Sequence, residues 1–317
     1  MKITVLDGAT LGSDLDLSPL SQVGETDIYN TTLPEEVEAR IAHSDVVIIN
    51  KVKLGAHNLE NAKNLKLICL AATGYDNVDT AYCREKGIAV CNVKGYSTNS
   101  VSQLTVLMVL SLITKLPEYT RSVEDLSYTK SGVQNRLEPV YHEIAGKTWG
   151  IVGFGDIGKQ VGKVAEALGC KVLVCRRNPR PGDGCVDIDT ICKESDIITL
   201  HTPLNDSTRN LIDENRINLM KKEVIIVNVA RGAVTDEAAV AKAIKDGRIG
   251  GFGSDVYSVD PMAADHPFTS VMHMDNVCLT PHMAWGAYES RCRCLSEIIE
   301  NIKTFFDGGI RNRVDLI

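Results

Sequence analysis

Four polar side chains that could take part in catalysis follow three apolar runs of strand length. Each lies just beyond its run: Arg231 after 223–227, Asp255 and Asp260 after 250–254, and His282 after 277–279. Parallel strands end at one edge of a sheet, so we expect these groups to converge there. A lone Arg, Asp or His is more often a solvated charge, a turn residue or a packing residue. Four polar groups at one edge instead favour a functional site.

These residue types suit the reduction of a carbonyl group. Histidine titrates near neutral pH, so His282 could deliver a proton to a carbonyl oxygen. A carboxylate beside it, Asp260, would favour the imidazolium form. The planar guanidinium of Arg231 could hold a substrate carboxylate by two hydrogen bonds and stabilise developing charge. The set therefore predicts a 2-oxo acid or a 2-hydroxy acid as the substrate.

A glycine pattern lies between an apolar run, 147–152, and a helical pattern, 159–169. Gly153 allows a tight turn, Gly155 lets the backbone approach a pyrophosphate, and Gly158 lets the helix pack on the strand. The free N–H groups at the start of the helix favour an anion. Such a pattern alone is weak, because glycine turns also occur for backbone reasons. With a strand before it and a helix after it, the pattern predicts a dinucleotide cofactor.

The next predicted strand, 171–175, is followed by Arg176 and Arg177, with Arg180 close behind. An NAD enzyme normally has Asp or Glu at this strand end, about 20 residues past the glycines. Arginines instead suit a 2′-phosphate by charge and by geometry. The sequence thus predicts that NADP(H) is preferred, with NAD(H) possible. Two alternatives stay open: a solvated basic loop, and an acid supplied by Asp183.

Alternating strand and helix patterns predict an α/β protein with parallel sheets and helices on both faces. The first third is expected to contain strands 2–6, 45–49, 65–71 and 88–92 and helices 34–42 and 80–86. A second unit is expected to begin near Lys147, with strands 149–152, 171–175, 197–200, 223–227, 250–254 and 277–279. A largely apolar stretch, 100–116, predicts a buried helix. A final helix is expected over 287–306.

Length and composition narrow the class of protein. The 317 residues suggest two domains at about 150 residues each. The net charge of −7 argues against a nucleic-acid binder or a polybasic membrane protein. No apolar run approaches the roughly 20 residues of a membrane span, so a cytoplasmic protein is expected.

The ten cysteines are expected to be free thiols in a reducing compartment. Cys69, Cys91, Cys175 and Cys278 lie inside apolar strand patterns, where Cys behaves as a small hydrophobic residue. No C-x-x-C pair is present, so neither a metal site nor disulfides are predicted.

Six segments carry a resemblance to a known family. They are 72–79 (ATGYDNVD), 92–98 (NVKGYST), the glycine pattern at 153–158, 201–204 (HTPL), 228–237 (NVARGAVTDE) and 280–282 (TPH). Together they resemble the D-isomer-specific 2-hydroxyacid dehydrogenase family, over nearly the whole chain. Within it, Ala284-Trp285 and 50–52 are most similar to glycerate dehydrogenases, also called hydroxypyruvate or glyoxylate reductases.

The resemblance implies reduction of a 2-oxo acid to a D-2-hydroxy acid, and the reverse. Arg231 would bind the substrate carboxylate and carbonyl, and His282 would be the acid/base. Asp260 stands where the family pattern has a Glu paired with that histidine, and Asp255 matches the residue that holds the nicotinamide amide. The other candidate cofactor contacts are Thr98, Gly153, Gly155, Asp156, Ile157, Gly158, Arg176, Arg177, Pro203, Thr208, Val229 and Ala230. The other candidate substrate contacts are Lys51, Val52 and Gly74.

The implied fold has two α/β domains. A Rossmann doubly wound cofactor domain is expected over 99–284, and a smaller flavodoxin-like substrate domain over 1–98 and 285–317. Such enzymes are usually homodimers, with the long helix after residue 99 crossing between subunits.

Two other functions are open on this scaffold. A dinucleotide-sensing, corepressor-like protein can keep the Arg, the acid and the His, and only turnover distinguishes it from an enzyme. Formate and phosphite dehydrogenases also use the fold. Asp260 disfavours them, because formate oxidation removes no proton from an oxygen and needs no His–carboxylate pair.

Overall fold

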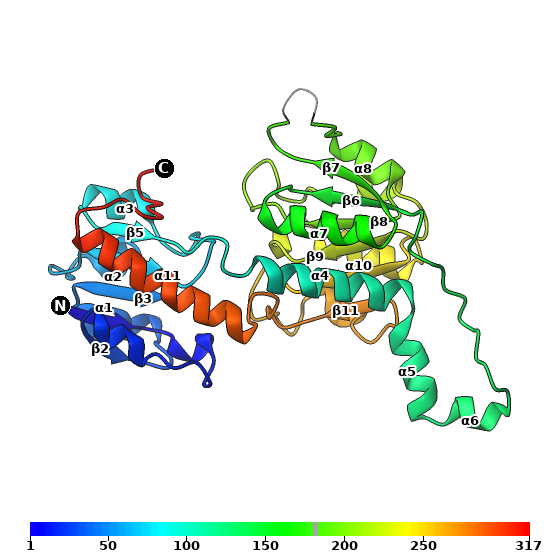
Figure 1. The fold of residues 1–317 in the computed structure, drawn as a ribbon, viewed down its shortest axis with the longest axis horizontal. Coiled ribbons are helices and arrows are strands. Elements are labelled where there is room, and N and C mark those ends of the chain that lie inside the picture. Colours follow the sequence, from blue (N-terminus) through cyan, green and yellow to red (C-terminus); the bar gives the residue numbers. More distant parts are fainter. Residues whose placement is uncertain (180–182) are drawn as a thin grey trace. The chain divides into compact units, whose positions relative to one another are not determined.

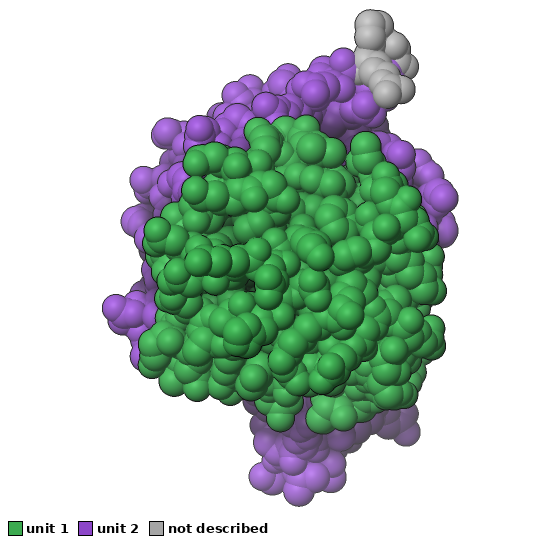
Figure 2. Space-filling view, turned by 90° about the vertical axis from the view of Figure 1, so that its left-hand side faces the viewer, with its two compact units in different colours: residues 1–97, 285–317 green, residues 98–284 purple. Residues whose placement is uncertain are grey.

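The computed structural model describes residues 1–179 and 183–317, which form two compact units, coloured separately in Figure 2. Unit 1 comprises Met1–Ser97 and Trp285–Ile317, and unit 2 comprises Thr98–Ala284. Each unit contains one parallel sheet with helices packed against it (Figure 1). The predicted α/β class, with two parallel sheets, is confirmed.

The sheet of unit 1 has five strands in the order β2-β1-β3-β4-β5, and all neighbours pair in parallel. This is the flavodoxin-like order that was predicted. The strands are β1 (Lys2–Val5), β2 (Glu25–Ile28), β3 (Val46–Ile49), β4 (Leu67–Leu70) and β5 (Ala89–Cys91).

Helices cover both faces of this sheet, because alternate strand residues point to opposite faces. One face packs against α11 (Tyr288–Phe306), and the other packs against α1 (Val37–Ile41), α2 (Ala56–Leu59) and α3 (Thr80–Glu85). Short 3₁₀ turns complete the unit: η1 (Gly8–Leu11), η2 (Ser18–Gln22) and η3 (Pro34–Glu36).

Unit 1 differs from the prediction at the helix expected over 34–42 and at two elements that were not predicted, α2 and β2. The expected helix 34–42 begins as the 3₁₀ turn η3, and the α-helix starts only at Val37. The carboxylate of Glu36 accepts the backbone N–H of Leu33 at 2.8 Å, which closes this first turn. Strand β2 was not predicted, because Glu25–Ile28 is an edge strand of exposed and half-buried residues without an apolar run.

The sheet of unit 2 has six parallel strands in the order β11-β10-β9-β8-β6-β7. All six were predicted, with ends that differ by two residues or fewer. They are β6 (Thr148–Val152), β7 (Lys171–Cys175), β8 (Ile197–Leu200), β9 (Ile225–Asn228), β10 (Gly251–Ser254) and β11 (Val277–Leu279). The helices are α4 (Thr98–Ile113), α5 (Leu116–Glu124), α6 (Ser127–Ser131), α7 (Asp156–Ala167), α8 (Ile188–Glu194), α9 (Glu214–Leu219) and α10 (Glu237–Lys245), with 3₁₀ turns η4 (Gly232–Val234) and η5 (Pro267–Ser270).

Helix α4 packs against α7 and against β9 and β10. It ends at Ile113, three residues before the predicted end, because Lys115 has a left-handed conformation with φ of 53°. No single helix in the described residues is long and apolar enough to span a membrane; only the bent pair of α4 and α5, taken together, meets that test.

Helices α5 and α6 and the segment up to β6 form an arm that extends away from the sheet of unit 2 (Figure 1). The two helices were not predicted. The arm exposes large hydrophobic side chains, namely Leu116, Val123, Leu126, Val133, Leu137, Val140 and Tyr141.

The strand order of unit 2 reverses between β6 and β8. The strand that follows β6 in sequence, β7, lies on one side of it, whereas β8 to β11 lie on the other. Ligands of open α/β sheets bind at such a reversal, beyond the carboxyl ends of the strands. Gly153 turns the chain there with φ of 93°, and a Cβ at this position would lie 2.5 Å from the carbonyl oxygen of His201. The tight turn predicted at Gly153 is present.

His201 follows β8 and keeps its imidazole inside unit 2. Both ring nitrogens are buried, and neither has a hydrogen-bond partner among the residues that the structure describes. Burial lowers the pKa of His201 to about 3, because the imidazolium would lose its hydration. The ring is therefore neutral at pH 7.

This burial predicts a specific acid sensitivity. In the unfolded chain the pKa of a histidine is about 6.5, so the unfolded state binds a proton below that pH. In the folded state His201 binds this proton only near its lowered pKa of about 3. Stability is therefore lost as the pH falls through this window, by about 1.4 kcal/mol per pH unit. We expect His201→Leu to reduce the loss of unfolding free energy between pH 7 and pH 5 by about 2 kcal/mol, measured by urea denaturation. The exposed control His142→Leu should keep the wild-type loss, and equal losses in both variants would contradict the prediction.

Candidate active site

Three neighbouring parallel strands position the predicted catalytic groups. Asn228 at the end of β9 is in register with Ser254 of β10, and Ser254 is in register with Leu279 of β11. The loops that follow therefore start at the same level of one edge of the sheet. They contain Arg231, Asp260 and His282 respectively.

The structure brings His282 and Asp260 together. The Nδ1 atom of His282 lies 2.7 Å from Oδ2 of Asp260, and their side chains are 22% and 32% exposed. Because the carboxylate can only accept, Nδ1 is the donor in this bond. The other ring nitrogen, Nε2, is left to exchange a proton with a ligand. The shorter Asp thus makes the histidine contact for which the family pattern has a Glu.

Asp255 fastens the loop that contains His282. Its buried carboxylate accepts the hydroxyl of Thr280 at 2.5 Å and the backbone N–H groups of Met283 and Ala284 at 2.8 Å. Burial raises the pKa of Asp255, while these hydrogen bonds and the nearby His282 act in the opposite direction. The three bonds hold the loop on both sides of His282, which itself has a left-handed conformation with φ of 56°.

Asn228 closes the loop that contains Arg231. Its side chain accepts the N–H of Ala230 at 3.0 Å and donates to the carbonyl of Arg231 at 2.9 Å. Nη1 of Arg231 donates to the carbonyl of Ala230 at 2.8 Å. Val229 and Ala230, the two candidate cofactor contacts of this loop, are half-buried.

The loops after β9 and β10 also touch each other. A Cβ at Gly232 would lie 2.0 Å from the carbonyl carbon of Tyr257 and 2.1 Å from the nitrogen of Ser258. Only glycine fits this close approach, so the chain just after Arg231 lies directly against the chain just before Asp260.

The remaining residues of the glycine pattern form the start of α7. A Cβ at Gly158 would lie 2.2 Å from the carbonyl oxygen of Gly153, so glycine is needed where α7 packs on the turn. Among the residues that the structure describes, nothing lies within 4 Å of a Cβ built at Gly155. Gly155 is the N-cap of α7, followed by Asp156 and Ile157, and no described side chain caps this end. Its free N–H groups therefore face an open space that suits an anion.

The loop after β8 holds Pro203 and Thr208. The hydroxyl of Thr208 donates to the carbonyl of Pro203 at 2.7 Å and accepts the N–H of Asn205 at 2.8 Å. Thr208 is buried, so its hydroxyl shapes the loop. Thr98, also a candidate contact, begins α4, and its carbonyl accepts the hydroxyl of Ser102 at 2.6 Å.

The end of β7 combines the predicted arginines with an acid. Nε of Arg176 donates to the carbonyl of Asn178 at 3.2 Å, and Nη1 lies 3.6 Å from Oδ2 of Asp183. Asp183 therefore returns to this strand end, despite the two prolines between them in sequence. Arg177 is exposed, whereas Arg180 lies outside the described residues.

The candidate substrate contacts Lys51, Val52 and Gly74 lie in unit 1. The carboxylate of Asp7 accepts the backbone N–H groups of Lys51 at 2.6 Å and of Val52 at 3.1 Å. The side chain of Asn77, three residues after Gly74, donates to the carbonyl of Val52 at 2.8 Å. These two loops of unit 1 are therefore tied together.

Asp7 and Asn228 also shape these loops, although neither was among the predicted site residues. Asn228 is the last residue of β9, and Asp7 follows β1 by two residues. Their place at strand ends was the available signal, but their partners are backbone groups, which a search for reactive side chains does not reveal.

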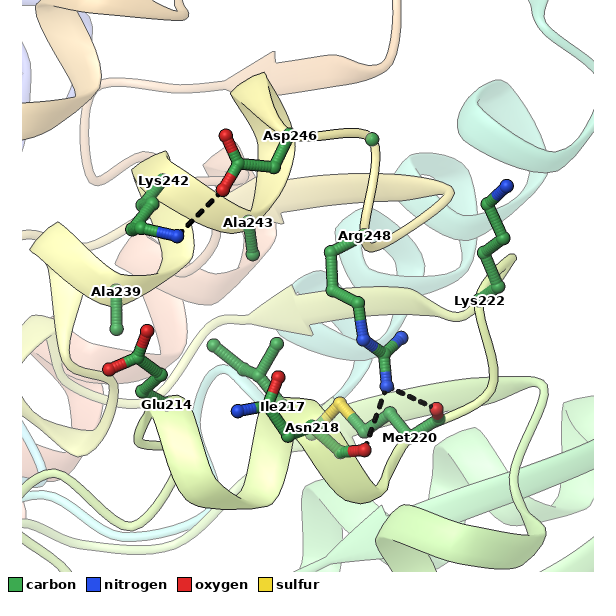
Figure 3. Close-up of a pocket in the computed structure, with 11 residues that line it drawn as sticks. Glu214, Ile217, Asn218, Met220, Lys222, Ala239, Lys242, Ala243, Asp246 and Arg248 are labelled. Carbon is green, nitrogen blue, oxygen red and sulfur yellow. Dashed lines mark hydrogen bonds and ion pairs between the residues drawn. The ribbon is translucent and has the colours of Figure 1, made fainter.

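A pocket of about 470 Å³ lies elsewhere in unit 2, between α9 and α10 (Figure 3). None of the candidate site residues lines it. Arg248 donates there to the carbonyls of Asn218 at 3.0 Å and Met220 at 2.6 Å, and Lys242 pairs with Asp246 at 2.7 Å. Arg248 thus satisfies carbonyl groups at the end of α9, as basic side chains near helix ends commonly do.

Comparison with known proteins identifies the family of this chain. A family model described as D-isomer specific 2-hydroxyacid dehydrogenase, NAD binding domain, matches residues 106–284. Glycerate dehydrogenase of Methylorubrum extorquens is 38% identical over 90% of this chain and 90% of its own. Hydroxypyruvate reductase of Blautia hydrogenotrophica is 34% identical over 99% of this chain and 100% of its own.

Among solved structures, an acyclic imino acid reductase in complex with NADPH and D-Arg has a TM-score of 0.88 and 28% identity. The match covers 99% of this chain and 100% of that one. The family match spans more than half of the chain and lies within unit 2, and relatives above 30% identity cover nearly all of the chain. The chain therefore belongs to the D-isomer-specific 2-hydroxyacid dehydrogenase family and is an oxidoreductase.

Proposed function

We propose that the chain reduces a short 2-oxo acid of the hydroxypyruvate or glyoxylate type to the D-2-hydroxy acid, and catalyses the reverse reaction. The observation that most directly supports this is the 2.7 Å bond between His282 and Asp260, at the sheet edge from which the Arg231 loop also starts. The relatives named glycerate dehydrogenase and hydroxypyruvate reductase support the substrate class.

Each of the three side chains has a defined task. In reduction, His282 as imidazolium donates Nδ1–H to Asp260 and the Nε2 proton to the carbonyl oxygen of the substrate. In oxidation, neutral His282 takes the hydroxyl proton back at Nε2. Arg231 binds the substrate carboxylate through its planar fork. His201 is excluded from the proton transfer, because burial lowers its pKa to about 3.

The start of α7 fits the pyrophosphate of a nicotinamide dinucleotide, because Gly155 leaves open space before uncapped N–H groups. When bound, this cofactor supplies or accepts the hydride. The residues that would hold it are Thr98, Gly153, Gly155, Asp156, Ile157, Gly158, Pro203, Thr208, Val229, Ala230 and Asp255. Asp255 would offer the nicotinamide amide an oxygen that also anchors the His282 loop.

We infer that NADP(H) is preferred over NAD(H). Arg176 occupies the position where an NAD enzyme has an acid, and Arg177 next to it is exposed. The ion pair with Asp183 is long, at 3.6 Å, so a 2′-phosphate would compete for Arg176 with a stronger, two-point charge-assisted contact. The structurally similar acyclic imino acid reductase was solved in complex with NADPH.

In unit 1 we assign Lys51, Val52 and Gly74 to the substrate. The N–H groups of Lys51 and Val52 already donate to Asp7. Their contribution would therefore come from the side chains, with the ammonium of Lys51 adding positive charge for an acid substrate.

We also infer a homodimer formed through the arm of unit 2. Its seven exposed hydrophobic side chains between Leu116 and Tyr141 are typical of a surface that a second protein covers. Ten free cysteines support a cytoplasmic, reducing location.

The function and the acid/base role are tested together by following NADPH and NADH oxidation with hydroxypyruvate, glyoxylate, pyruvate and phenylpyruvate. We expect turnover with the first two, and a loss of kcat of about 10²-fold or more in His282→Ala, as for a general acid. His273→Ala, an exposed histidine of the same unit, should keep the wild-type kcat. Absence of turnover with all four acids would favour the dinucleotide-sensing role, and a His282→Ala variant with full kcat would remove His282 from the mechanism.

Asp260→Asn extends this test. Without the carboxylate the imidazolium loses its partner, so the limb of the rate profile for reduction that requires protonated His282 should move to lower pH. An unchanged profile would show that Asp260 does not act on His282 during turnover.

Arg231→Lys keeps the positive charge but loses the planar guanidinium group, which can bind a carboxylate through two hydrogen bonds. We expect KM for the 2-oxo acid to rise strongly and kcat to fall, because the substrate carboxylate would be held at one point instead of two. Arg248→Lys, at the separate pocket between α9 and α10, is the matched control. If Arg231→Lys had the kinetics of the control, Arg231 would serve only as a positive charge or a structural group.

The cofactor preference is tested by kcat/KM for NADPH and NADH in the wild type and in Arg176→Asp. We expect the wild type to favour NADPH and the variant to lose or reverse this preference, since a lost charge-assisted bond costs about 1.5–3 kcal/mol, or roughly 10- to 150-fold. Lys193→Asp, an equal charge reversal on the exposed side of α8, should not change the ratio. A wild type with equal or higher kcat/KM for NADH would overturn the inference.

A further inference from the structure

Glu237 and His266 form a buried ionisable pair that the proposed chemistry does not use. Their side chains are 8% and 4% exposed, and Oε2 of Glu237 lies 2.9 Å from Nε2 of His266. Glu237 is the first residue of α10, and His266 is the N-cap of η5. His266 ends the loop 258–266, which contains Asp260, whereas Glu237 contacts this loop from α10.

The hydrogen bonds around His266 determine its tautomer. Nδ1 accepts the backbone N–H of Phe268 at 3.2 Å, so it carries no hydrogen. The hydrogen is therefore on Nε2, which donates to Glu237. The ring is also held by aromatic contacts, with centroids 5.7 Å from Tyr257 and 4.9 Å from Phe268.

The second oxygen of Glu237 holds the other end of the same loop. Oε1 accepts the backbone N–H of Ser258 at 2.8 Å, two residues before Asp260. Both partners of Glu237 are therefore N–H donors. A carboxylate can satisfy both, whereas the single oxygen of a glutamine amide can satisfy only one.

The same loop is fixed from two other directions. The backbone at Tyr257 and Ser258 lies against Gly232, directly after Arg231. The hydroxyl of Tyr257 donates to the carbonyl of Thr280 at 2.9 Å, two residues before His282. Glu237 thus binds both ends of the loop, and the chain at 257–258 contacts the segments next to the other two proposed catalytic residues.

We propose that Glu237 and His266 are positioning residues, which clamp both ends of the loop 258–266 and thereby hold Asp260 at hydrogen-bond distance from His282. This rests on the proposed role of the His282–Asp260 pair. Neither residue touches the reacting groups; the clamp acts by fixing where the carboxylate of Asp260 lies.

The test uses the titration of the His282 imidazole, followed by NMR in the full chain and assigned with His282→Ala. Two carboxylates act on this ring, Asp260 at 2.7 Å and Asp255 across the loop. The variants leave Asp255 and its three donors unchanged. Loosening Asp260 should therefore lower the midpoint of the His282 titration, in the direction that Asp260→Asn gives but by less.

Four variants separate positioning from general stability. Glu237→Gln and His266→Leu should lower the midpoint and reduce kcat by about tenfold, a smaller loss than the 10²-fold expected for His282→Ala, while KM for the cofactor changes little. His266→Gln retains an N–H donor close to the position of Nε2 and should restore the midpoint. Asp246→Asn, the same change of charge at the exposed end of α10, should leave it at the wild-type value.

Folded Glu237→Gln and His266→Leu chains with the wild-type midpoint would overturn the proposal. If Glu237→Gln does not fold, the comparison of His266→Leu with His266→Gln decides alone, because each changes only one end of the loop. The midpoint does not depend on turnover. A His282→Ala variant with full kcat would therefore refute the catalytic role while leaving the measured clamp intact, so the two failures are distinguishable.

Discussion

The buried carboxylate of Asp255 is the constraint on which the rest of the site depends. A charge in the interior must be hydrogen-bonded, and Asp255 finds its donors in the hydroxyl of Thr280 and the N–H groups of Met283 and Ala284. These donors lie on both sides of His282, so satisfying them forces the chain through the left-handed conformation of that residue. The cost of leaving such a carboxylate unpaired, several kcal/mol, exceeds the small cost of one positive φ. The orientation of the histidine loop thus follows from the burial of a neighbouring acid.

Apolar patterning was sufficient to predict most of the fold. The central strands are short apolar runs bounded by turns, and such runs must be buried, so β6 to β11 could be located to within two residues. Patterning failed where burial is weak. Glu25–Ile28 pairs at the edge of its sheet with exposed side chains, and the backbone ladder to β1, not hydrophobicity, makes it a strand. The arm helices α5 and α6 were not predicted for a related reason. Their large hydrophobic side chains are exposed, so they show no pattern of burial against a core.

The candidate site could likewise be predicted only in part. That Arg231, Asp260 and His282 lie at one edge of the sheet could be predicted, because side chains just past neighbouring parallel strands must share that edge. The contacts that orient them could not, because they join residues far apart in sequence: Asp7 to Lys51, Glu237 to His266, and Asp255 to Ala284. Each of these acids takes backbone or ring N–H groups as partners, and nothing in a single sequence marks which N–H a carboxylate will accept. The return of Asp183 to Arg176 across a proline-rich loop is a further case.

Aspartate in place of glutamate at position 260 raises the demand on the backbone. The side chain is one methylene shorter, so it reaches His282 only if its Cα is brought closer, and with fewer rotatable bonds it cannot correct an error in backbone position. Close contacts with neighbouring residues hold the loop in the position that this shorter side chain requires. Gly232 has no side chain, so the backbone at Tyr257 and Ser258 can lie directly against it. The carboxylate of Glu237 accepts hydrogen bonds from both ends of the loop. A 2.7 Å bond between Asp260 and His282 is therefore a property of the loop and its neighbours as much as of the two residues that form it.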